Sequence, residues 1–112
     1  MTEPDYVISL DGERIAVIDP EGEQTALTLA ELNGVMIEIN DGAPFGADVW
    51  WLLFGADDRI AVAFPQGASG EQAAIDWLIA LPGFDHDAMI MAMGSTANAV
   101  FPVWRRVPGT EI

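Results

Sequence analysis

Hydrophobic and polar residues alternate at every second position in several short segments of the first two thirds of the chain, which is typical of half-buried β-strands. Val35 to Asn40 is the clearest case, because Val35, Ile37 and Ile39 share one face. Asp11-Gly12 joins the first two segments and predicts a hairpin, since glycine tolerates the positive φ of a tight turn. The predicted strands in this part are Tyr6 to Leu10, Arg14 to Ile18, Thr25 to Leu27, Val35 to Asn40, Asp48 to Phe54 and Arg59 to Phe64.

The segment from Asp48 to Phe54 departs from this alternation, because it is apolar on both faces. Such a pattern predicts a central strand that is covered on both sides. Trp50 and Trp51 are adjacent in this segment, so their side chains must point to opposite faces. The strand after it alternates large residues with Ala61 and Ala63, and we expect this small face to let a helix approach closely.

Helical spacing replaces the alternation after Pro65. Ser69 has the spacing of a capping box, and a helix is expected to run to Leu81, where Pro82-Gly83 ends it. Asp85 can cap a second, shorter helix that reaches about Met93. The first helix should bury Ala74, Ile75, Leu78 and Leu81, widened by Trp77 and Ile79, and the second should place Met89, Ile90 and Met93 on one side.

Strands come first and helices late, without β-α-β alternation. We therefore expect an α+β fold, with an antiparallel sheet of about six strands and two helices of the C-terminal half packed on one face. Ala99 to Arg105 should be a last strand at a sheet edge, because Pro102 cannot donate to a ladder. The element order also resembles a pleckstrin-homology-like layout. The 112 residues are expected to form one domain, with a frayed tail at 107–112.

Thr28 to Glu31 fits a second capping box, in which each side chain satisfies the backbone N–H of the other residue. Asn33-Gly34 offers a stop after barely one turn. We expect a single helical turn that connects two strands.

The charge balance restricts the possible partners. Eighteen Asp and Glu residues face four arginines and no lysine, so the formal net charge is −14. This charge repels phosphates, and neither nucleic acid nor an anionic membrane is expected as a ligand. It would steer a basic protein toward the chain at low salt, although solubility alone explains a diffuse acidic surface.

Two other properties predict a cytoplasmic location. No apolar run approaches the roughly 20 residues that cross a bilayer. Residues Met1 to Asp5 lack the cationic and apolar regions of a secretory signal. Cysteine is absent, which excludes disulfides and thiolate chemistry and makes folding indifferent to the redox compartment.

No residue pattern predicts catalysis. His86 lies between Asp85 and Asp87, where it could act as a general acid or bind a metal, but the start of a helix explains both carboxylates. Asp57-Asp58 lacks the spacing of an EF-hand, and the loop from Pro65 to Gly70 lacks the lysine of a P-loop. We expect no catalytic residue, no metal site and no cofactor.

Aromatic residues are the strongest indication of function, because tryptophan is enriched at binding hot spots. The helices should cover one of Trp50 and Trp51, and the other needs a curled sheet or a second molecule to cover it. Trp104-Arg105-Arg106 could anchor an acidic group of a partner. The favoured interpretation is that these arginines pair within the chain, with carboxylates or with an aromatic face. The candidate binding residues are Trp50, Trp51, Phe45, Trp104 and Arg105.

Several short motifs resemble those of one family. They are Pro65-Gln66-Gly67-Ala68, Leu81-Pro82-Gly83-Phe84-Asp85, Ala92-Met93, and Phe101 with Trp104-Arg105-Arg106. This combination is similar to a family of small bacterial proteins of about this length that has no established activity. The resemblance runs from Pro44-Phe45 to Arg106. It implies a stand-alone bacterial domain and assigns no catalytic residue.

These observations favour a non-catalytic cytoplasmic protein-interaction domain, expected to be a homodimer, that acts through an aromatic sheet face or an edge strand. One alternative is an acidic immunity-type inhibitor of a basic partner, which only the charge supports. Another is a small-molecule-binding or catalytic domain with a pocket near the loop from Gly42 to Gly46. That alternative requires convergent polar groups and a strongly perturbed carboxylate or His86.

Overall fold

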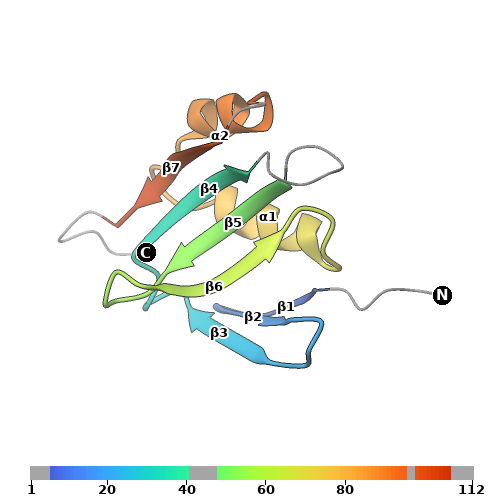
Figure 1. Cartoon of the computed structure of the whole chain (residues 1–112). Helices are drawn as coiled ribbons and strands as arrows, with labels where there is room; N and C mark the ends of the chain where they lie inside the picture. The colour runs from blue at the N-terminus through green and yellow to red at the C-terminus, as the bar shows by residue number, and fades with distance from the viewer. Residues whose placement is uncertain (1–5, 41–47, 96–97, 107–112) are drawn as a thin grey trace.

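The computed structural model describes residues 6–40, 48–95 and 98–106. These residues form seven strands and two helices, and the strands make two antiparallel sheets (Figure 1). The predicted α+β class is confirmed.

The smaller sheet has three strands in the order β1-β2-β3. Gly12 has a φ of 61° in the turn between the first two strands, so the predicted hairpin is confirmed. Asp19 closes the next turn, because its carboxylate accepts hydrogen bonds from the backbone N–H groups of Glu21 and Glu23, both at 2.9 Å. The bounds are β1 (Val7–Asp11), β2 (Arg14–Ile18) and β3 (Gln24–Thr28).

The larger sheet has four strands in the order β6-β5-β4-β7. β5 is thus an internal strand and β7 an edge strand, as the sequence predicted. The expectation that β5 is covered on both sides is wrong within the described residues, because only one of its faces belongs to the core. The two helices lie between β6 and β7 in the chain. The bounds are β4 (Gly34–Asn40), β5 (Asp48–Phe54), β6 (Ile60–Pro65), α1 (Glu71–Ile79), α2 (His86–Met93) and β7 (Ala99–Arg105).

The expectation of one sheet of about six strands is wrong, because β3 and β4 do not pair. Between them, the backbone carbonyl of Thr28 accepts from the N–H groups of Glu31 and Leu32, which makes the predicted helical turn. The Glu31 carboxylate accepts from the Thr28 backbone N–H at 3.1 Å and from its hydroxyl at 2.9 Å, and these bonds lower the pKa of Glu31. This turn redirects the chain, so β4 begins a second sheet.

The two sheets are joined where β1 meets the segment after β6. The Ile8 N–H donates to the Ser69 carbonyl at 2.7 Å, and the Ser69 N–H donates to the Tyr6 carbonyl at 2.9 Å. The predicted capping box at Ser69 is wrong, since Gly70 is the N-cap of α1 and no side chain caps it. The Ser69 backbone serves the contact with β1 instead.

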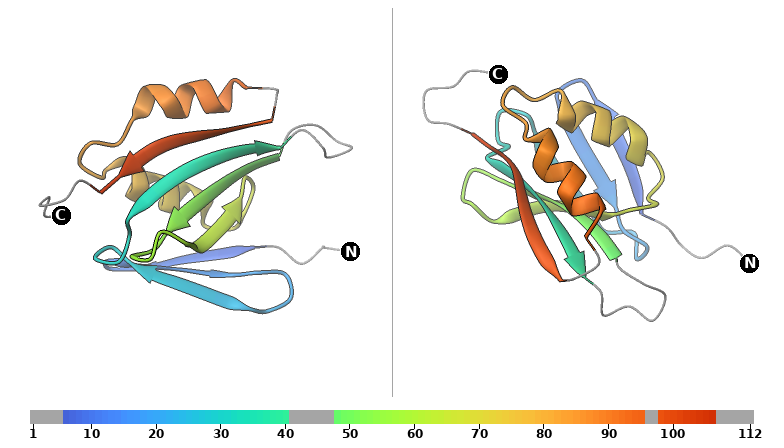
Figure 2. Two further views of the ribbon diagram at one scale, coloured as in Figure 1. Left: turned by 60° about the vertical axis from the view of Figure 1, so that its left-hand side comes forward. Right: turned by 90° about the horizontal axis from the view of Figure 1, so that it is seen from above.

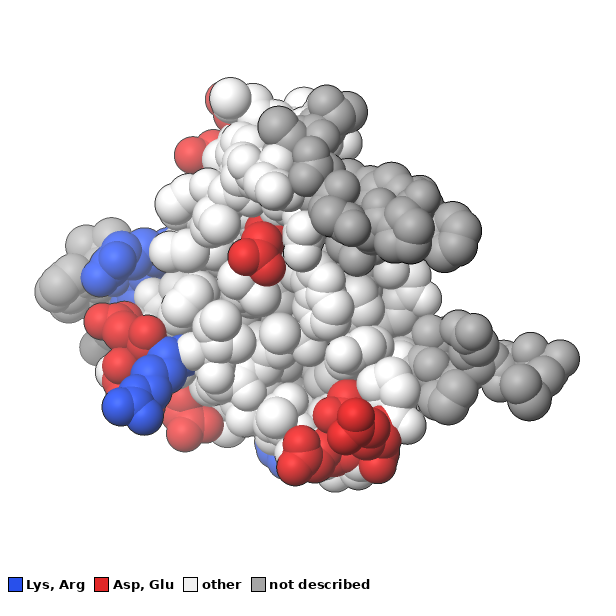
Figure 3. Space-filling view, in the orientation of Figure 1, with Lys and Arg blue, Asp and Glu red and all other residues white. Residues whose placement is uncertain are grey.

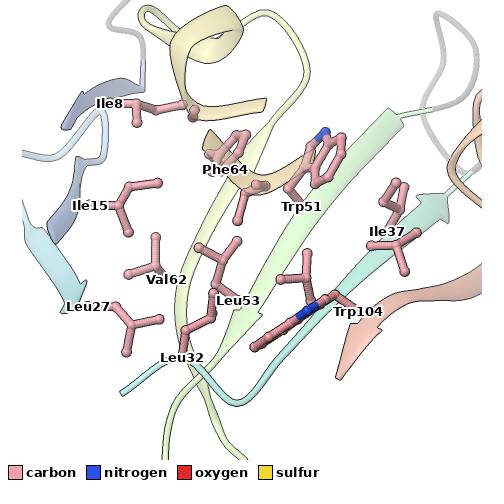
Figure 4. Close-up of a cluster of buried hydrophobic side chains, with 14 of the residues drawn as sticks. Ile8, Ile15, Leu27, Leu32, Ile37, Trp51, Leu53, Val62, Phe64 and Trp104 are labelled. Atoms are coloured by element: carbon pink, nitrogen blue, oxygen red, sulfur yellow. The ribbon is translucent and has the colours of Figure 1, made fainter. Parts of the chain in front are cut away.

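Side chains from both sheets and both helices form the core, which lies on one face of the four-stranded sheet (Figure 4). We call this its inner face. Trp51 and Phe64 stack on it with ring centroids 6.2 Å apart. The Nε1 atom of Trp51 is buried and has no hydrogen-bond partner among the residues that the structure describes. The main contributors are Ile8, Ile15, Leu27, Leu32, Val35, Ile37, Trp51, Leu53, Val62, Phe64, Ala74, Leu78, Ala92 and Trp104.

Three expectations about the helices differ from the structure. The helices lie on the side of the four-stranded sheet to which Val62 and Phe64 point, not on the side of the small residues, because the larger residues fill the core between the layers. α2 buries Ala92 and packs Met89 against the core, which lets it approach β7 and β4, whereas Ile90 is 65% exposed and Met93 43% exposed. α1 ends at Ile79 rather than Leu81. The predicted cap by Asp85 is confirmed, since its carboxylate accepts from the Ala88 N–H at 2.9 Å.

Gly70 is required at the junction of the two sheets. Its φ is 85°, and a Cβ added there would overlap the carbonyl oxygen of Ile8. Gly67 has a similar φ of 95° with open space around it, so it is the matched control. We expect Gly67→Ala to lower the free energy of unfolding by about 1–2 kcal/mol, and Gly70→Ala to lower it by about 2 kcal/mol more.

Urea unfolding of both variants measures these losses. If Gly70→Ala and Gly67→Ala lowered the free energy of unfolding equally, a close approach between Gly70 and β1 would be contradicted.

Candidate functional site

The face of the four-stranded sheet that points away from the core is also largely apolar. Strand geometry sends successive side chains to opposite faces, so each core residue of β5 has a neighbour on this other side. Met36 lies opposite Leu52, and Glu38 opposite Trp50, in the pairing of β4 with β5. We call this surface the outer face; it carries Met36, Glu38, Trp50, Leu52, Phe54, Val100 and Pro102.

Within the described part of the chain, no helix or strand covers the outer face. Both helices contribute to the core on the opposite side of the sheet, as the two views of Figure 2 show. Met36, Leu52 and Phe54 are only half-buried, and Val100 is 50% exposed. Figure 3 shows this side of the molecule, where charged groups gather mostly toward the edges. The outer face is therefore an open apolar surface on a strongly acidic protein.

Three shallow hollows open onto the outer face. The first, of about 310 Å³, lies at the start of β4 beside Phe54, Asp58 and Arg105. The second, of about 240 Å³, lies between Trp50 and the three-stranded sheet. The third, of about 390 Å³, lies at the end of β4 beside Asn40. None of the three is a closed pocket, so together they make the outer face uneven rather than flat.

The residues predicted for binding divide between the surface and the core. Trp50 lies on the outer face, where its ring meets Tyr6 edge-on with centroids 5.5 Å apart. Trp51 is fully buried and Trp104 is 5% exposed, so both belong to the core. Phe45 lies outside the described residues, as does the loop from Gly42 to Gly46. Trp50 and Arg105 are the predicted residues that the structure brings to the outer face.

Arg106 is held within the molecule, as the sequence favoured. Its Nε donates to the Leu32 carbonyl at 2.9 Å, its Nη2 donates to the Leu29 carbonyl at 2.7 Å, and its guanidinium lies 5.6 Å from the Trp104 ring centroid. Arg105 differs, because no ion pair or side-chain hydrogen bond is found for it among the described residues. Arg106 therefore fixes the end of β7, and Arg105 is available for contact.

Glu38 was not predicted as a residue of this surface, and neither was the placement of Arg105 on the same face. Glu38 lies in the middle of the face, between Trp50 on β5 and Val100 on β7. Arg105 pairs with Gly34 across the same two strands, so both charges are on one surface. The alternation of β4 could have placed Glu38, but a register shift between Val35 and Met36 in the pairing with β7 hides the position of Arg105.

The other candidate chemistry does not assemble into a site. His86 begins α2 and contacts the Phe84 ring, with centroids 5.0 Å apart. Asp58 accepts a hydrogen bond from the Asn33 side chain in the first hollow. Glu31, whose pKa is lowered, caps its own turn and lines none of the three hollows. Across the described residues, no three His, Asp or Glu side chains cluster as metal ligands.

Comparison with models of protein families, with curated proteins and with solved structures finds no match in any of the three. Within the described part of the chain, no helix is long and apolar enough to span a bilayer. The family resemblance of the sequence motifs stays a prediction.

The two adjacent arginines differ in a way that stability measurements can test. Arg106→Ala removes two charged hydrogen bonds to backbone carbonyls, and we expect it to lower the free energy of unfolding by about 2–4 kcal/mol. Arg105→Ala removes no such contact, and we expect a change within about 0.5 kcal/mol.

Chemical denaturation followed by tryptophan fluorescence measures both. A larger loss for Arg105→Ala than for Arg106→Ala would contradict these roles.

Proposed function

We propose that the chain is a non-catalytic protein-interaction domain that binds a protein surface through the outer face of its four-stranded sheet. One observation carries the proposal: β5 is apolar at every position from Val49 to Phe54, although only its inner face belongs to the core. Trp50 meets the Tyr6 ring, but Trp50, Leu52 and Phe54 of the other side are not part of the described core. A partner that covers this side would account for these incompletely buried apolar residues.

The hydrophobic effect supplies the driving force for such binding. Burying a large apolar side chain contributes about 1.5–3 kcal/mol, and Trp50, Leu52 and Phe54 are all incompletely buried. Tryptophan in the middle of a patch is the usual anchor of a binding hot spot. Polar groups at the margin, such as Asn33 and Asp58, match the rim of a protein interface.

The acidic field supports a partner that is a protein rather than a polyanion. With a net charge of −14, the chain repels phosphate backbones and anionic lipid surfaces. A protein partner, or a second copy of the chain, fits this proposal, as does a cytoplasmic location. An immunity-type inhibitor of a basic partner is a special case of it, for which net charge is the support.

A small-molecule or catalytic function has weaker support. It requires polar groups that converge in a concave pocket. The first hollow holds Asn33, Asp58 and Arg105, but it is open and lies at the opposite end of β4 from the predicted loop. The bacterial family and the pleckstrin-homology-like layout stay proposals that rest on sequence motifs and element order.

Photo-crosslinking in the cells that naturally make the protein tests the proposal. A photoreactive amino acid at Leu52, on the outer face, should give discrete covalent products of higher mass. The same probe at Gln72, on the exposed side of α1, should give at least about fivefold less, because specific binding buries a defined patch.

Trp50→Ala in the probe-bearing chain should reduce the products at Leu52, because it removes the aromatic anchor. Products that are absent at Leu52, or equal at Leu52 and Gln72, would contradict the proposed function.

A further inference from the structure

We infer that the outer face is covered by the outer face of a second copy of this chain, in a dimer in which Glu38 of each copy pairs with Arg105 of the other. The inference rests on the proposed function and names the partner of that same surface. Three observations lead to it: an unpaired carboxylate, an available guanidinium, and their placement on the sheet.

Glu38 limits what can cover the outer face. It is half-buried among apolar neighbours, and no ion pair or hydrogen bond is found for its carboxylate within the described ranges. A molecule that covers the face removes water from this carboxylate. A buried carboxylate without a cation or hydrogen-bond donors is strongly unfavourable. A charged donor is the strongest partner for it, so the occupant is expected to bring a cation to Glu38.

The chain itself offers that cation. Of its four arginines, Arg106 is used by backbone carbonyls, Arg14 lies on the three-stranded sheet, and Arg59 lies in the turn between β5 and β6. Arg105 is the arginine at the margin of the outer face without a described ion pair. The face thus carries a central negative charge and a marginal positive charge, which is the requirement for self-complementarity.

The positions of the two charges fit a two-fold axis. Arg105 pairs with Gly34, and Glu38 lies four positions further along β4, which is about 13 Å at the rise of a strand. Met36 lies midway. A two-fold axis that crosses the strands over Met36 brings Glu38 of one copy to the Arg105 end of the other.

The same axis matches apolar residues with one another. It sets Trp50 opposite Phe54 of the second copy and leaves Met36 near the axis. The strands of the two sheets stay aligned, as in a β-sandwich whose sheets lie about 10 Å apart. An arginine side chain can also cover the offset of about 4.8 Å between neighbouring strands. Apolar contact and charge pairing therefore favour one arrangement.

The size and charge of the face predict a weak dimer. Four strands of six or seven residues present a plan area of about 400 Å², which is less than the roughly 800 Å² per partner of a standard interface. Two copies with a net charge of −14 each also repel one another. Salt screens this repulsion more than it screens the covered pairs, so salt should strengthen the dimer. Salt would weaken the binding of a basic partner.

Sedimentation equilibrium of the purified full chain tests the inference by charge reversal. The wild type should be a reversible dimer that strengthens between about 50 and 500 mM NaCl. Glu38→Arg and Arg105→Glu should each raise the dissociation constant about tenfold or more. The double variant E38R/R105E should return to within about threefold of the wild type, because both pairs are restored with opposite polarity.

Two matched controls change charge away from the outer face. Glu13→Arg and Arg14→Glu make the same charge changes at exposed positions of the three-stranded sheet and its turn. Both should leave the dimer unchanged within about threefold once salt is high. Far-UV circular dichroism of every variant confirms that the comparison is made between folded chains.

The inference is overturned if the wild type stays monomeric at every protein and salt concentration. It is also overturned if Glu38→Arg and Arg105→Glu change the dissociation constant no more than the controls do, or if the double variant does not restore it. A dimer that salt weakens also counts against it. If the chain is monomeric but the Leu52 probe crosslinks another protein in cells, the second copy is excluded and the proposed function stands. If the chain is monomeric and the Leu52 probe forms no crosslinked product in cells, both the second copy and the proposed function are excluded.

Discussion

The structure depends on one constraint, which is that a β-strand sends successive side chains to opposite faces. β5 is apolar at consecutive positions, so it cannot bury all its large residues against a single layer. Trp51 and Leu53 enter the core, where both are fully buried. Trp50, Leu52 and Phe54 must then lie on the other side. The core and the open apolar surface are two results of the same six-residue pattern.

The smaller sheet and the two helices contribute their core residues on the inner side, and Tyr6 also meets Trp50 at the margin of the outer face. Backbone hydrogen bonds between β1 and Ser69 tie the smaller sheet to the segment after β6, and the left-handed conformation of Gly70 permits that approach. Arg106 ties the end of β7 to the turn between the sheets through two carbonyls. α2 comes close through Ala92. Because these connections all act on one side of the four-stranded sheet, the chain closes its core while the outer face stays open.

Local patterns predicted the strands and helices well, because alternation, capping residues and turn residues act over a few positions. The bounds of β2, β5 and β7 agree with the sequence prediction, and the turn at Thr28 to Glu31 has its expected hydrogen bonds. The division into two sheets could not be predicted, since it depends on which strands pair across long distances. The core-facing side of α2 was predicted only in part, because Ala92 and Met89 face the core while Ile90 and Met93 are exposed.

The candidate surface was partly predictable for the same reason. Adjacent tryptophans must point to opposite faces, so one exposed indole was expected before it was known which one. The pairing of Glu38 with Val100, and of Arg105 with Gly34, follows from the register of β4 and β7 and from its shift near Met36. No local pattern contains that information. The sequence therefore indicated Trp50 and Arg105 as candidate binding residues, but not Glu38, nor the placement of Glu38 and Arg105 on one surface.

β5 divides its tryptophans between a closed core, which holds Trp51, and an open apolar face, which carries Trp50. ¹⁹F NMR of the chain labelled with 5-fluorotryptophan tests it most directly, with the Trp50 and Trp51 signals assigned by single substitutions to phenylalanine. The account predicts that in dilute solution the Trp50 signal shifts between H₂O and D₂O and moves as protein concentration rises, while the Trp51 signal responds to neither. A Trp51 signal that senses solvent, or a Trp50 signal that senses neither solvent nor concentration, would contradict it.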